Sequence, residues 1–257
     1  MCRRTSRTRL AVYLVLLMAV ALFMSGCKDS SEQSPGQNNN DANNTGPGGQ
    51  GATSVPDGQM VPVVIELPKP MFVGTPQNIS VPNLEKPLGK ARPPFLAPAG
   101  VENVALGKMV TSSDSQPTVG KLDFVTDADK EATDGSYVEL GLFVQHVTID
   151  LGGEYEIYAV VFWHYHKQAR VYSDVIVQVA GDPDFVTGVK TLFNNDIDNS
   201  AGLGIGQDMH YVETAEGKLV YSAEGVRGRY VRLYSGGSSA DPFNHYIEVE
   251  VYGKPAK

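Results

Sequence analysis

Cysteine is nearly absent from this chain of 257 residues, which contains only Cys2 and Cys27. Two cysteines cannot form a disulfide framework, and no Cys-x-x-Cys motif for metal or redox chemistry is present. The sequence also lacks His-Glu-x-x-His, Gly-x-Ser-x-Gly and P-loop motifs. These absences argue against the metalloprotease, esterase and nucleotide-hydrolysing classes that such motifs mark.

Long apolar runs are also scarce, and residues 10–24 form the single example near the start of the chain. This run is shorter than the ~20 residues that a membrane-spanning helix needs. It follows four arginines within residues 3–9 and leads into Met24-Ser25-Gly26-Cys27. That layout is typical of a secretory signal, and its end resembles the lipobox of bacterial lipoproteins. The resemblance implies removal of residues 1–26 and a diacylglycerol lipid on Cys27.

Ordinary signal cleavage and an uncleaved anchor are the alternatives to a lipid on Cys27. Ordinary cleavage favours small residues at positions −1 and −3, and Met24 occupies the second of these. Removal of Cys2 with the signal would leave Cys27 unpaired in an oxidising compartment, which lipid attachment explains. Lys28 follows the cysteine, and in lipoproteins of Gram-negative bacteria this residue implies the outer membrane, on its periplasmic or surface face.

Composition divides the next hundred residues into two parts. Residues 27–58 are rich in Ser, Asn, Gln and Gly, which predicts a disordered linker. Residues 59–99 contain apolar clusters separated by prolines, which disfavour both helices and central strands. Apolar clusters free in water would be a liability. We therefore expect residues 59–99 to form an extended arm docked on the folded domain.

The chain is acidic, with 21 Lys and Arg against 29 Asp and Glu and a net charge of −8. Without the four arginines of the signal, the net charge is −12. Such a domain repels phosphate backbones and anionic headgroups, so nucleic acid is excluded as a partner. Carboxylates suit calcium and the hydroxyls of neutral sugars.

From residue 100 to 257 the apolar residues recur with a period of two. Alternation is clear in residues 146–151, 175–179, 231–234 and 247–251, and Gly-Gly pairs at 152–153 and 236–237 mark turns. A period of two indicates half-buried strands. Many short strands separated by turns predict an all-β antiparallel sandwich or jelly roll.

Five segments of this region carry a family resemblance when taken in order. They are Asn103-Val-Ala-Leu-Gly-Lys108, Val125-Thr-Asp-Ala-Asp129, Val147-Thr-Ile-Asp-Leu-Gly152, Arg229-Tyr-Val-Arg-Leu-Tyr234 and Ile247-Glu-Val-Glu-Val-Tyr-Gly253. The set resembles a discoidin domain (coagulation factor V/VIII type C), which has the galactose-binding-like fold. The resemblance implies a jelly roll that is usually non-catalytic, with loops at one end that bind glycans, lipid headgroups or proteins. Ala128 stands where the family commonly has glycine, so the turn there is expected to be altered.

The resemblance also implies a structural Ca²⁺ between an acidic loop and the last strand. The matching positions are Asp127, Asp129 and Glu248. Hard oxygen ligands suit this ion. The alternative is a solvated acidic loop that caps a turn.

His164 and His166 stand two residues apart and would leave a strand on the same face. With His245 or Asp196 as a third donor, they could bind zinc or copper. Together with Trp163 they could instead form a sugar platform, in which an aromatic ring stacks on the pyranose. A packed, hydrogen-bonded strand end is the third interpretation.

Residues 194–200 form a polar loop that includes Asn195, Asp196 and Asn199. Its amides and carboxylates could bind hydroxyls or an ion, and such residues are also ordinary turn formers. The loop lacks the glycine and the final glutamate of an EF-hand.

The leading hypothesis is therefore a membrane-anchored, non-catalytic module that recognises carbohydrate at the cell envelope. Its expected ligand-binding residues are Trp163, His164, His166, Arg170, Asn195, Asp196, Asn199 and His245. One alternative is a structural envelope lipoprotein that binds another protein. Another is a metal-dependent enzyme built on His164 and His166.

Overall fold

The computed structural model describes residues 58–72 and 79–257. The predicted signal peptide, Cys27 and the linker up to residue 57 lie outside the described residues. Within the described part of the chain, no helix is long and apolar enough to cross a membrane.

The described residues form eleven strands and one short 3₁₀ helix, η1 (Leu122–Thr126). The strands are β1 (Met60–Val63), β2 (Phe95–Pro98), β3 (Glu102–Asn103), β4 (Met109–Ser112), β5 (Val138–Leu140), β6 (Gln145–Trp163), β7 (Ile176–Ala180), β8 (Lys190–Asn194), β9 (Lys218–Ser235), β10 (Asn244–Tyr246) and β11 (Glu248–Pro255). All strand pairs are antiparallel. The predicted all-β antiparallel fold is confirmed.

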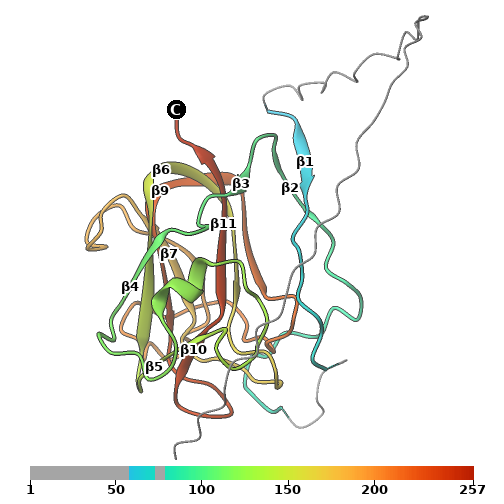
Figure 1. Ribbon diagram of the computed structural model, residues 1–257, viewed down its shortest axis with the longest axis vertical. Coiled ribbons are helices and arrows are strands. Elements are labelled where there is room, and N and C mark those ends of the chain that lie inside the picture. Colours follow the sequence, from blue (N-terminus) through green and yellow to red (C-terminus); the bar gives the residue numbers. More distant parts are fainter. Residues whose placement is uncertain (1–57, 73–78) are drawn as a thin grey trace, which may run out of the picture. The chain divides into compact units, whose positions relative to one another are not determined.

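The main sheet has the order β3-β11-β6-β9-β7-β8, with β4 beside β6. It folds over on itself, because β6 and β9 bend together where their register shifts beyond Asp150. Val147 and Ile149 from the first half of β6 share one core with Val160 and Phe162 from the second half. Figure 1 shows β6 and β9 arching together at the end of the molecule where β11 terminates. The sandwich interior lies between the two halves, and both ends of β6 point to the opposite, loop-bearing end.

The Pro-rich arm covers the outer face of the second half of β6. β1 and β2 pair with each other, and Phe95 and Ala97 of β2 are buried in a second core with Trp163 of β6. The Arg92 guanidinium donates hydrogen bonds to the carbonyls of Gly217 and Glu216. The sheet therefore buries apolar side chains on both faces in this half of the sandwich.

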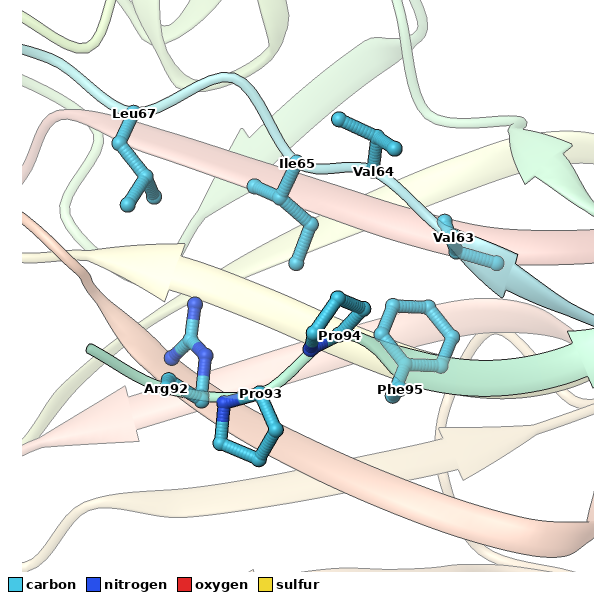
Figure 2. Close-up of a pocket in the computed structure, with 8 residues that line it drawn as sticks. All are labelled: Val63, Val64, Ile65, Leu67, Arg92, Pro93, Pro94 and Phe95. Atoms are coloured by element: carbon cyan, nitrogen blue, oxygen red, sulfur yellow. The ribbon is translucent and has the colours of Figure 1, made fainter. Parts of the chain in front are cut away.

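A shallow apolar groove of ≈ 130 Å³ lies within the arm itself, between residues 63–67 and 92–95. Figure 2 shows Ile65 and Leu67 pointing toward the segment of residues 92–94 that leads into β2, while Val64 points away. Val64 is 80% exposed. The groove separates two segments of the arm and lies apart from the loops that join β5, β6, β9 and β10.

Candidate functional site

Trp163 is a residue of the second core, and the structure does not place it on the surface. Its side chain is fully buried beneath the arm, and its indole nitrogen donates a hydrogen bond to the Ala215 carbonyl at 3.0 Å. The Lys130 ammonium lies 5.2 Å from the ring centroid. In this arrangement Trp163 offers no free ring face to a sugar, which corrects the expectation that it forms a platform.

His164 is also fully buried, between the two halves of the sandwich. Its Nδ1 lies 2.7 Å from Glu213 Oε1, and its ring stacks on Tyr172 with centroids 4.3 Å apart. Among the described residues, His164 Nε2 and Glu213 Oε2 have no hydrogen-bond partner. A buried histidine paired with a buried carboxylate keeps polar groups inside the fold, and loss of one member would leave the other unsatisfied.

The same-face geometry predicted for His164 and His166 is wrong, because β6 ends at Trp163 and strand alternation stops there. His166 Nε2 lies within 2.9 Å of the Lys130 carbonyl, whereas His164 contacts Glu213. Within the described ranges, the one group of three His, Cys, Asp or Glu side chains able to gather around an ion is Asp174, Asp196 and Asp198. The two histidines thus share no metal-binding cluster with His245 or Asp196.

Six side chains gather at the loop-bearing end, and we call them the loop-end cluster. They are Tyr137, Glu139, Tyr165, Arg170, Asp241 and His245. The β5–β10 ladder places His245 directly opposite Glu139. The loop after β6 supplies Tyr165 and Arg170, and the loop after β9 supplies Asp241.

His245 is buried at the base of this cluster and forms two hydrogen bonds. Its Nε2 lies 3.0 Å from Glu139 Oε2, and its Nδ1 lies 2.9 Å from the Tyr172 hydroxyl. Burial lowers the pKa of His245 to about 4. A neutral ring with the proton on Nε2 fits both contacts, because Nε2–H donates to Glu139 and Nδ1 accepts from Tyr172.

Arg170 holds the outer part of the cluster together. Its Nη1 lies 2.8 Å from Asp241 Oδ2, and its guanidinium lies 4.7 Å from the Tyr165 ring centroid. Tyr165 and Tyr137 meet edge to face, 5.3 Å apart. Arg170 is buried, whereas both tyrosines and the two carboxylates of Glu139 and Asp241 are partly exposed. Two aromatic rings and two acceptor groups therefore reach the surface over a buried base.

The 194–200 loop uses its polar groups to build turns. Asn195 is buried, and its Oδ1 accepts from the Val175 amide at 2.7 Å. Asp196 is also buried, and its carboxylate accepts from the amides of Ser200 and Ala201. Asn199 is exposed at a φ of 61°, and its side chain accepts from the Gly204 amide. These contacts correspond to the turn-forming interpretation of the loop.

The acidic loop proposed for calcium lies against the start of β11. Glu248 is fully buried, and its Oε2 accepts from the Ala128 amide at 3.1 Å. Its Oε1 has no hydrogen-bond partner in the part of the chain that the structure describes. Burial raises the pKa of Glu248 to about 9. Asp129 accepts hydrogen bonds at both oxygens, whereas the Asp127 carboxylate accepts at Oδ1 from the Asp129 amide. Within the described residues Asp127, Asp129 and Glu248 do not converge as a group of three ligands, and the buried Glu248 oxygen is the feature of this loop that suits a hard cation.

Ala128 adopts a φ of 70°, the left-handed conformation usually reserved for glycine. The expectation of an altered turn is therefore wrong. The backbone of this loop keeps the shape that glycine would favour, and alanine adopts it at some cost in strain.

Comparison with known proteins gives similarity in fold alone. No protein-family model and no curated protein matches the chain. Chitosan-binding module 1 from a chitosanase/glucanase of Paenibacillus sp. IK-5 is 17% identical and covers 59% of this chain and 99% of its own, with a TM-score of 0.41. A fucose-binding module from Streptococcus pneumoniae is 16% identical and covers 59% and 97%, with a TM-score of 0.42.

A Family 89 glycoside hydrolase from Clostridium perfringens is also similar, at 21% identity and a TM-score of 0.43. The match covers 60% of this chain but 15% of the hydrolase, so this chain spans a small part of that enzyme's length. At these identities and TM-scores the matches assign no ligand to this chain.

Of the predicted binding residues, the structure brings Arg170 and His245 together. The sequence patterns did not indicate Tyr137, Glu139 or Asp241, because these residues meet only through the β5–β10 ladder and two loops. Tyr165 stands between the two histidines in the aromatic run of residues 162–166. That run was the one signal that could have led to it.

Proposed function

We propose that this protein is a non-catalytic module that binds neutral carbohydrate through the loop-end cluster. The observation that carries the proposal is the pair of partly exposed tyrosine rings beside two partly exposed carboxylates, all positioned by buried Arg170 and His245. A pyranose has an apolar face that stacks on an aromatic ring and hydroxyls that donate to carboxylates. A site of this kind suits a neutral ligand on an acidic molecule.

Pre-organisation supports this function. Arg170 is fixed by Asp241 and by the Tyr165 ring, and His245 is fixed by Glu139 and Tyr172. Side chains held by such contacts lose little additional conformational freedom when a ligand binds, which favours affinity. The solved modules from Paenibacillus sp. IK-5 and Streptococcus pneumoniae are described as binding chitosan and fucose respectively.

The test is a glycan array followed by titration calorimetry on the full-length protein in mild detergent. We expect Tyr165→Ala to weaken binding of the best neutral glycan about ten-fold or more, because stacking and its associated contacts are lost. Tyr221→Ala is the matched control, since Tyr221 is partly exposed on β9, where its hydroxyl contacts the arm at Leu96. Equal affinity in the wild type and Tyr165→Ala would refute this site.

We also propose that Asp127 and Glu248 hold a structural Ca²⁺, with Asp129 shaping the loop between them. The ion would supply the partner that Glu248 Oε1 lacks and would tie the loop after η1 to β11. At a calcium concentration of roughly 100 times Kd, binding would stabilise the fold by about 2.7 kcal/mol.

Thermal unfolding with and without a chelator checks the calcium proposal. We expect chelation to lower the Tm of the wild type and to leave the Tm of Glu248→Gln unchanged. Asp123→Asn, in the exposed part of η1, is the control and should keep the calcium response. A wild-type Tm that does not respond to the chelator would contradict the proposal.

Finally, we propose that a lipid on Cys27 anchors the module at the outer membrane, with residues 28–58 as its tether. The sequence at 24–27 and the unpaired cysteine support this part of the proposal. Two or more acyl chains make such anchoring stable.

A further inference from the structure

The turn between β5 and β6 exposes two large apolar side chains at the loop-bearing end. Phe143 is 85% exposed and Leu142 is 43% exposed. Phe143 also has a φ of 65°, a conformation that a bulky residue rarely adopts. An exposed aromatic ring on a strained backbone persists only where the surroundings determine its conformation.

Those surroundings fix the carbonyls of residues 141–143. The Asn244 side-chain amide donates to the carbonyls of Gly141 and Phe143 at 2.8 and 2.9 Å, and the Gln145 side chain donates to the Leu142 carbonyl at 2.8 Å. The Gly141 amide in turn donates to Asp114 Oδ2. The backbone of residues 141–143 is therefore held at four points while its two largest side chains face water.

Asn244 is itself anchored in the interior. It is fully buried, and its Oδ1 accepts from the Ser235 hydroxyl and the Gly237 amide, both at 2.8 Å. Asn244 precedes His245 in β10, so the residue that holds the turn and a residue of the loop-end cluster are neighbours on one strand. The turn and the cluster therefore share a rigid support at the same end of the sandwich.

The polar neighbours of this turn indicate the kind of ligand. The groups beside it are hydroxyl, amide and carboxylate side chains, namely those of Ser113, Asp114 and Gln145. An anionic membrane surface is attracted by basic side chains, and no such residue holds this turn in the described contacts. An aromatic face with an amide and hydroxyl rim matches a pyranose, which is apolar on its face and hydroxylated at its edge.

We propose that Phe143, with Leu142 beside it, forms a second subsite that stacks on a further sugar ring of an oligosaccharide bound at the loop-end cluster. This inference rests on the proposed function, because the first ring lies on Tyr165. The affinity of the protein for a glycan would then depend on the number of sugar units. Monosaccharides would contact the loop-end cluster alone, and longer glycans would also contact Phe143.

The experiment measures the affinity of the full-length protein for the mono- to hexasaccharides of cellulose, chitin and β-1,4-galactan. In the wild type we expect one series to gain affinity with length. This gain should be about ten-fold in affinity. Phe143→Ala should remove it and leave the affinity for monosaccharides unchanged. Phe143→Trp should retain the gain because it keeps an aromatic face. Val186→Ala, at another 77% exposed apolar residue, should behave as the wild type.

The outcomes separate this inference from the function on which it rests. A length-dependent gain that persists in Phe143→Ala would overturn the second subsite and leave the loop-end cluster intact. Failure of every sugar to bind the wild type would overturn both. Binding to phosphatidylcholine vesicles that depends on Phe143, without any effect on oligosaccharides, would replace the second subsite by a lipid contact.

Discussion

Tyr165 stands where the alternation of β6 has ended, and this position determines the role of the residues around it. Its two histidine neighbours turn toward separate partners inside the fold, whereas its own ring lies partly exposed over Arg170. Polar groups that are buried need partners, and His164 and His166 each have one. The histidines therefore support the loop-end cluster from within, and tyrosines form its surface.

His146 provides a test of burial at the scale of one residue. Burial, with a smaller contribution from the Arg232 charge, lowers the pKa of His146 from 6.5 to about 4. Between these values the unfolded chain binds a proton at His146 that the folded chain does not, so the contribution of His146 to stability falls as the pH falls from 6.5 to 4. We expect His146→Gln to flatten that fall in thermal unfolding measured across this pH range.

The dependence of stability on pH should become weaker in His146→Gln but should not disappear. The pKa of His245 is also lowered to about 4, so His245 contributes to stability with the same sign. An identical pH dependence in the wild type and His146→Gln would show that His146 is not protected from protonation in the fold.

Among the elements, β2 covers the outer face of the second half of β6. Phe95 and Ala97 point into the second core, while Leu96 between them is 49% exposed. The strand period of two thus gives the arm one face for the domain and one for water. Without the arm, the ring of Trp163 and its neighbours would lie on an uncovered sheet.

Two neighbouring substitutions test this packing. Phe95→Ala should lower the free energy of unfolding by about 3–4 kcal/mol, because a buried aromatic ring is replaced by a cavity. Leu96→Ala should change it by less than about 1 kcal/mol. Urea unfolding followed by tryptophan fluorescence is well suited, since Trp163 lies in the same core. Equal losses in the two variants would contradict the docking of β2.

At the scale of the whole molecule, an acidic domain follows a polar linker and a cysteine next to an apolar run. A lipid at Cys27 would hold this domain near a membrane whose anionic headgroups repel it. The domain itself would then face solvent, where its loop-end cluster meets soluble or surface-bound glycans. This arrangement follows from the proposals for Cys27 and for the cluster together.

Detergent-phase partition tests the anchor on the full-length protein produced in a Gram-negative host. The wild type should enter the detergent phase, because each buried CH₂ of an acyl chain contributes ~0.8 kcal/mol. Cys27→Ser should remain in the aqueous phase. Cys2→Ser, at the other cysteine of the chain, is the control and should partition as the wild type does. If all three proteins remained in the aqueous phase, the proposed lipid on Cys27 would be contradicted.

Alternation of apolar residues is a local property, and it was enough to predict the central strands of the main sheet. Residues 146–151 and 231–234 lie in β6 and β9 with the expected inward faces. The run 247–251 was predicted only in part, because β11 begins at Glu248 and Ile247 packs in the second core, whereas Val249 and Val251 face the sandwich interior. Local composition also predicts turns in residues 194–200, because Asn and Asp side chains there accept hydrogen bonds from nearby backbone amides.

Which polar residues reach the surface depends on tertiary contacts. Alternation tells which residues share a strand face, but whether that face is covered depends on segments far away in the chain. Trp163 is hidden by an arm some seventy residues earlier, and His164 by a glutamate that follows 49 residues later. Glu139, Arg170 and Asp241 meet because three separate loops and strands converge at one end. A period of two predicts which strand face packs on the core, but it does not reveal whether a distant segment covers the other face, because that contact is long-range.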